Sequence, residues 1–134
     1  MFKLSLVLYT VFVTGTIYHA DPAQCNADYL TTASMKKINP DNPAGHRWIA
    51  VSRDLEKLGF TMGTRVKISG AGDLDGIWTI EDRMNKRWTM RIDFLVNKTR
   101  KYGKWHNIKM EKISNKLAYW NTWFNSVKSI LKYC

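Results

Sequence analysis

The chain has 134 residues, 45% of them apolar and 13% aromatic, so it is long enough for one domain with a substantial core and is not composed like a disordered protein. Its 21 Lys and Arg against 11 Asp and Glu give a net charge of +10, which favours anionic partners such as nucleic acid, anionic membranes or an acidic cell-wall polymer. Nucleic acid is disfavoured because zinc-finger spacing and aromatic RNA-binding signatures are missing. The three histidines are far apart in sequence and no metalloprotease, nucleophile-elbow or phosphate-loop motif occurs, so we expect neither a metal nor another cofactor.

The N-terminal segment has two interpretations. Residues 1–13 combine one Lys with a mostly apolar run, as in a signal peptide. From Thr10 onward, however, Val11, Val13 and Ile17 alternate with Thr residues and Phe12, which predicts a β-strand. We therefore expect a strand from about Thr10. For the preceding segment, residues 1–9, an export signal or its remnant is left open.

The central part of the chain reads as short strands separated by turns. Residues 21–43 are rich in Pro, Asn and Asp and predict a long loop. A short helix is predicted over Arg53–Leu58, with Ser52 as its N-cap and Gly59 ending it. Strands are predicted over residues 48–51, 65–69, 77–81, 90–96 and 105–113. This spacing indicates an all-β protein that forms a small β-barrel.

The tail over residues 114–134 has a different pattern. Apolar residues recur there at spacings of three and four, which predicts an amphipathic helix that packs on the barrel, or that instead binds a membrane surface or a partner protein. The two cysteines, Cys25 and Cys134, either form one disulfide or remain free thiols.

Two aspartates carry the chemical hypothesis. Asp93 lies in the middle of a predicted strand whose other face holds Met90, Ile92, Phe94 and Val96, and burying a carboxylate there is costly. Asp82 follows directly on another predicted strand. If these neighbouring strands share a cleft, repulsion and burial raise one pKa and supply the protonated acid that cleavage of a glycosidic bond needs. The alternative is that each aspartate forms a structural ion pair with Arg83, Arg87 or Arg91.

Five segments in order resemble the three-aspartate (3D) domain, which itself resembles the catalytic double-psi β-barrel of membrane-bound lytic transglycosylase A. The resemblance covers residues 10–113 and implies a six-stranded double-psi β-barrel with one short helix. The segments are Thr31–Ser34, Ile49–Leu55, Gly63–Val66, Gly76–Asn85 and Arg91–Phe94. Asp82 and Asp93 are eleven residues apart and match two of the family's aspartates, the second of which is the catalytic acid.

The resemblance also implies supporting residues. Ser52 stands where the family has its first aspartate, so Asp54 and Asp75 are alternative candidates for that role. Thr32 and Asn85 lie in matching segments and are candidate substrate-binding residues. Residues 83–88 stand in place of the glycine-rich stretch of the family. This difference affects the walls of the substrate groove that the resemblance implies.

The function implied by the resemblance is that of a lytic transglycosylase of the cell envelope. Asp93 would protonate the oxygen between N-acetylmuramic acid and N-acetylglucosamine and then accept the proton of the muramic acid C6 hydroxyl. Glycan strands of peptidoglycan would be the partner. The protein itself would be encoded by a bacterium, or encoded by a phage and delivered to the wall. The main alternative is a non-catalytic glycan-binding module, or a structural module that docks on an envelope or virion protein through the C-terminal helix.

Overall fold

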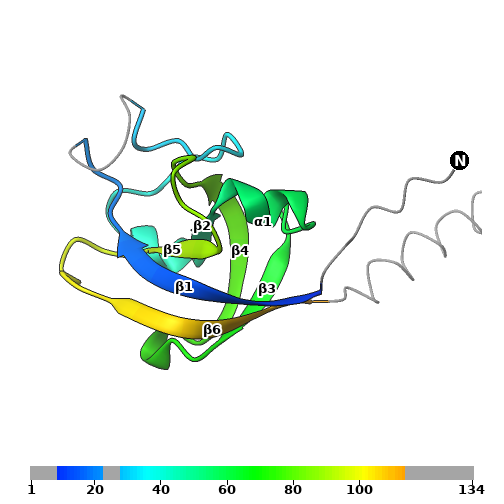
Figure 1. Ribbon diagram of the computed structural model, residues 1–134. Helices are drawn as coiled ribbons and strands as arrows, with labels where there is room; N and C mark the ends of the chain where they lie inside the picture. Colours follow the sequence, from blue (N-terminus) through cyan, green and yellow to red (C-terminus); the bar gives the residue numbers. More distant parts are fainter. Residues whose placement is uncertain (1–8, 23–27, 114–134) are drawn as a thin grey trace, which may run out of the picture.

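A computed structural model describes residues 9–22 and 28–113 of the chain (Figure 1). Six strands, one α-helix and two short 3₁₀ helices make up this part. In chain order they are β1 (Thr10–Tyr18), η1 (Pro43–His46), β2 (Trp48–Val51), α1 (Arg53–Lys57), β3 (Arg65–Ser69), η2 (Gly72–Leu74), β4 (Gly76–Arg83), β5 (Arg91–Leu95) and β6 (Lys104–Lys112).

The six strands close into a barrel in the order β1-β5-β2-β4-β3-β6. β1 pairs with β5 and β2 pairs with β4 in parallel, while the other four pairings are antiparallel. The connection from β1 to β2 passes β5, and the connection from β4 to β5 passes β2. These two interlocked connections are the defining feature of a double-psi barrel, and the fold class predicted from sequence is confirmed.

Alternating apolar residues of all six strands fill the barrel. Val11 and Val13 from β1 and Ile92 and Phe94 from β5 are among the buried residues of one cluster, which closes around the fully buried Trp78. Because successive side chains of a strand point to opposite faces, Thr16 and Asp93 lie on the outer surface of the same two strands. The barrel wall therefore supplies both the core and the outer face on which polar residues gather.

Most predicted element bounds agree with the structure. β2 and β3 have the predicted ends, and α1 follows Ser52 as expected, although Ser52 makes no side-chain capping bond. The Ser52 hydroxyl instead accepts a hydrogen bond from the Arg91 amide at 3.0 Å. The prediction for Met90 is wrong: it precedes β5, has a positive φ of 46° and is partly exposed, because the chain turns there before the strand begins.

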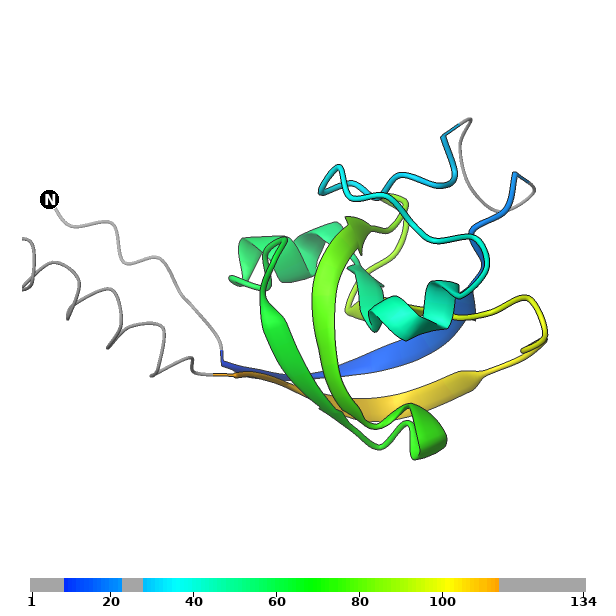
Figure 2. The ribbon, with the colours of Figure 1, turned by 180° about the vertical axis from the view of Figure 1, so that it is seen from behind.

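The two ends of the barrel differ in what covers them. In both views of the ribbon, α1 and the long β1–β2 connection lie at one end, and η2 lies at the other (Figures 1 and 2). β1 and β6 run side by side, with Thr10 opposite Glu111. The predicted C-terminal helix, Cys25 and Cys134 lie outside the described residues. Within the described ranges, no helix is both long and apolar enough to span a bilayer.

Candidate functional site

A cleft of about 900 Å³ opens on the outer face of the barrel wall. Its floor is made by β1, β2, β4 and β5. One side is the segment 28–35 of the β1–β2 connection, and the other is the segment 83–91 between β4 and β5 together with the first residue of α1. The two interlocked connections of the double-psi fold thus form the walls of a single groove.

The two predicted aspartates lie in one row of residues across this floor. Thr16 of β1 is in register with Asp93 of β5, Asp93 is in register with Ala50 of β2, and Ala50 is in register with Asp82 of β4. The sequence suggested that β4 and β5 are neighbours. This prediction is wrong, because β2 lies between them. All four residues line the cleft.

Asp93 is half-buried in the cleft and accepts a hydrogen bond from the Thr16 hydroxyl. Burial raises the pKa of its carboxyl above the usual value for an aspartic acid. The Thr16 hydrogen bond and the charge of Arg91 oppose this rise, while the charge of Asp82 adds to it. Desolvation is the largest of these effects, so the protonated form of Asp93 persists to higher pH than in an exposed aspartate.

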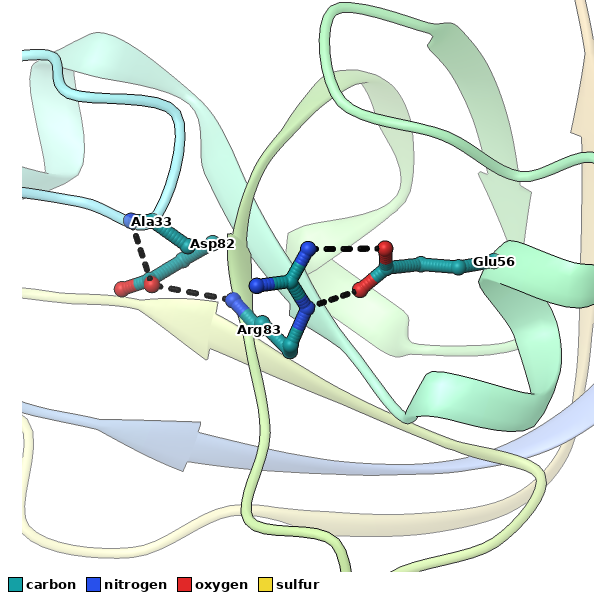
Figure 3. Close-up of polar contacts among 4 residues, drawn as sticks. All are labelled: Ala33, Glu56, Asp82 and Arg83. Atoms are coloured by element: carbon teal, nitrogen blue, oxygen red, sulfur yellow. Dashed lines mark hydrogen bonds and ion pairs between the residues drawn. The ribbon is translucent and has the colours of Figure 1, made fainter.

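Asp82 is held by three donors, two of them backbone amides. Its Oδ1 accepts hydrogen bonds from the amides of Ala33 at 3.0 Å and Arg83 at 2.9 Å, and its Oδ2 accepts one from the Tyr18 hydroxyl at 3.1 Å. Figure 3 shows the two backbone bonds. The bond from Ala33 joins the β1–β2 connection to the end of β4, and the bond from Arg83 lies within β4. Asp82 therefore accepts three hydrogen bonds, whereas Asp93 accepts one from Thr16, and the two carboxylates have contrasting environments within one cleft.

A bulge in β4 directs Asp82 into the cleft. The register with β2 shifts after the pair Ile49–Ile80, so that the next pair is Ala50–Asp82 and Glu81 is the extra residue. Glu81 is buried under the β1–β2 connection, where Lys36 Nζ lies 2.7 Å from its Oε2. That contact is an ion pair, and neither Glu81 oxygen has a hydrogen bond of good geometry among the described residues.

The alternative ion pairs of the two aspartates do not form within the described parts of the chain. Arg83 binds Glu56 instead, with its Nε 2.5 Å and its Nη2 2.9 Å from the two carboxylate oxygens (Figure 3). The guanidinium groups of Arg87 and Arg91 lie over the ring of Trp88, at 4.6 and 4.0 Å from its centre. Both aspartates are thus left facing an open polar cleft.

The four other predicted site residues divide into two pairs. Thr32 and Asn85 line the cleft. The Thr32 hydroxyl accepts a hydrogen bond from the Lys36 amide at 3.1 Å, and Asn85 Oδ1 accepts one from the Arg87 amide at 3.1 Å, so each stabilises a turn in a cleft wall.

Asp54 and Asp75 do not line the cleft. Asp54 Oδ2 accepts a hydrogen bond from the Met90 amide at 2.8 Å and anchors the β4–β5 connection to α1. Asp75 Oδ1 accepts one from the Ala71 amide at 2.6 Å beside η2, at the end of the barrel away from α1. The structure gives both of these carboxylates a role in holding the backbone.

Three cleft residues were not identified from the sequence. Thr16 and Tyr18 alternate on the outer face of β1, and only the parallel pairing of β1 with β5 brings them beside the aspartates. Trp88 lies in a basic segment, Lys86-Arg87-Trp88, which was a detectable signal for a binding wall. Among the described residues, no group of three His, Cys, Asp or Glu side chains is arranged to hold a metal ion.

No protein-family model matches this chain, and no curated protein matches it. Among solved structures it is similar to the apo form of an expansin from Clavibacter michiganensis, with a TM-score of 0.50 and 10% sequence identity. The alignment covers 79% of this chain and 51% of the expansin, so the chain spans about half the length of that protein. At this identity the likeness shows the fold alone, and it supports the double-psi barrel that the strand order indicates.

Proposed function

We propose that this barrel cleaves glycan strands of peptidoglycan as a lytic transglycosylase, with Asp93 as the general acid and base. The observation that carries the proposal is the state of Asp93. Its carboxyl lies in an open cleft, has no ion-pair partner among the described residues, and has a pKa raised by burial. An aspartic acid in this state keeps its proton to higher pH than an exposed one and can donate it to a leaving oxygen.

One carboxyl group suffices for the whole reaction. Asp93 donates its proton to the glycosidic oxygen as the bond from that oxygen to C1 of N-acetylmuramic acid breaks. The C6 hydroxyl of the same sugar then attacks C1, and its proton passes to the Asp93 carboxylate. The products are a 1,6-anhydro end and a free hydroxyl on the departing sugar, so neither water nor a nucleophilic side chain is consumed.

Asp82 has a different role in this scheme. Its three donors hold it as an acceptor on the same floor, two strands away from Asp93. Adjacent strands lie about 4.8 Å apart, so the backbones of the two aspartates are about 10 Å apart, a separation in which one sugar ring can lie. We expect Asp82 to accept a hydrogen bond from a sugar hydroxyl and to stabilise positive charge that develops at C1.

Digestion of purified peptidoglycan tests the proposal directly. The protein is expected to release fragments that end in 1,6-anhydro-N-acetylmuramic acid, recognised by mass spectrometry as a loss of one water relative to hydrolysed ends. Fragments with reducing ends would indicate a hydrolase. Binding of glycan strands without any release would favour a glycan-binding module on the same barrel. Either result would overturn the transglycosylase assignment.

A further inference from the structure

The α1 side of the cleft carries more positive charge than its own carboxylates balance. Four arginines line the cleft, and Arg83 is neutralised by Glu56. Arg53, Arg87 and Arg91 form no ion pair with a carboxylate of the described residues. This concentration of unpaired guanidinium groups on one wall distinguishes the cleft from a groove for a neutral polysaccharide.

Two of these arginines, Arg87 and Arg91, are also preorganised. The guanidinium groups of Arg87 and Arg91 both lie over Trp88, and such cation–π contacts restrict their position. The Nε of Arg91 is buried and has no hydrogen-bond partner among the described residues. A buried donor without a partner is costly. Arg91 also lines the cleft, where an anion can accept charge-assisted hydrogen bonds from its guanidinium group.

We propose that the wall formed by Arg53, Arg87 and Arg91 binds a carboxylate carried by the N-acetylmuramic acid side chain, so that the cleft selects anionic over neutral glycan. This inference rests on the proposed function for its substrate class. Arg91 and Asp93 are two residues apart on one strand face, about 7 Å along the strand. An anion bound by Arg91 is therefore a short substituent of the sugar at the cleaved bond, either the lactyl acid or the first acidic residue of an attached peptide.

The test is equilibrium binding by calorimetry with the Asp93→Asn variant of the full chain, which removes turnover. Three tetrasaccharides of alternating N-acetylglucosamine and N-acetylmuramic acid serve as probes. One carries the free lactyl acids, one carries their neutral methylamides, and one carries L-alanyl-D-glutamic acid on each lactyl group. The free acid or the dipeptide form is expected to bind at least about 10-fold more tightly than the methylamide, and whichever does so identifies the source of the carboxylate.

Variants of the wall and a matched control complete the test. Arg87→Gln and Arg91→Gln, each added to Asp93→Asn, should reduce the preference for the anionic probes to about 2-fold or less, since each removes a charged donor. Arg65→Gln removes the same charge from the exposed outer face of β3 and should leave the preference intact. Because Arg87 is exposed in a connection, its variant remains informative if Arg91→Gln fails to fold.

Equal binding of all three probes would overturn the inference, as would an equal loss of preference in Arg65→Gln, which would show that only net charge matters. The result is separable from the proposed reaction. A protein that prefers anionic probes but releases no anhydro ends supports this site and refutes the transglycosylase. A protein that releases anhydro ends but binds all three probes equally supports the transglycosylase and refutes the anion site.

Discussion

Asp93 and Asp82 face the same cleft although their strands do not touch. Ala50 of β2 is in register with both, so the two carboxylates belong to a single row that crosses three strands. They differ in what surrounds them. Asp93 is desolvated and has a raised pKa, while Asp82 accepts two backbone hydrogen bonds and one from Tyr18. This asymmetry supports the proposal that Asp93 is the proton donor and that Asp82 is a hydrogen-bond acceptor.

Asp93→Asn is expected to lower the release of anhydro fragments by about 10²–10⁴-fold, because the amide has nearly the same shape but cannot transfer the proton. Liquid chromatography with mass spectrometry measures the release. Asp75→Asn makes the same chemical change outside the cleft and should retain activity. Near-normal turnover by Asp93→Asn would show that Asp93 is not the acid.

The raised pKa of Asp93 also predicts how stability depends on pH. The folded state keeps this proton at a pH where the unfolded chain, with an ordinary pKa of about 3.9, has lost it. The native state therefore binds more protons. The contribution of Asp93 to the free energy of unfolding falls as pH rises from the unfolded-state pKa through the higher folded-state pKa of this carboxyl.

Urea denaturation of wild type and Asp93→Asn across this window measures the effect. The variant should gain stability relative to wild type as pH rises, and the difference should level off above the folded-state pKa. A difference that is constant with pH, or that changes in the opposite direction, would contradict the raised pKa.

Thr16→Val should move the alkaline limb of the pH–activity profile to higher pH. The Thr16 hydroxyl donates to the Asp93 carboxylate and lowers its pKa, so an isosteric side chain without the hydroxyl allows a further rise. Thr10→Val, at the exposed start of β1, is the matched control. An unchanged profile in Thr16→Val would remove Thr16 from the site.

Lys36→Met should destabilise the protein by about 1–3 kcal/mol, because it leaves the buried Glu81 carboxylate without its ion-pair partner. The effect is below that of a fully buried pair since the Lys36 side chain is 55% exposed. Adding Glu81→Gln to Lys36→Met should restore part of the loss. A double-mutant cycle with no coupling would show that the pair does not anchor the β1–β2 connection.

Deletion of residues 1–20 should unfold the barrel, whereas deletion of residues 1–8 should not. β1 lies between β5 and β6, so its loss leaves two strand edges unpaired and exposes the core. Circular dichroism and thermal melting distinguish the two truncations. A folded, cooperatively melting protein that begins at Asp21 would mean that β1 is dispensable.

The sequence alone determined approximately where the barrel strands lie and which face of β5 bears Asp93. Alternation of Ile92 and Phe94 with Asp93 is a local property of an extended chain, and it holds wherever that strand is placed. The alternation of Val11 and Val13 in β1, and of Val66 and Ile68 in β3, also depends only on neighbouring residues. These features follow from period-two burial and needed no knowledge of strand order.

Tertiary structure decided how the site is assembled. Simple alternation from Trp78 and Ile80 would turn Asp82 into the core, and the bulge at Glu81 reverses this. The β1–β2 connection contacts both residues, because Lys36 pairs with Glu81 and the Ala33 amide donates a hydrogen bond to Asp82. Likewise, Thr16 meets Asp93 only because β1 pairs in parallel with a strand more than seventy residues later. Strand order and bulges depend on contacts between distant segments, so no local pattern encodes them.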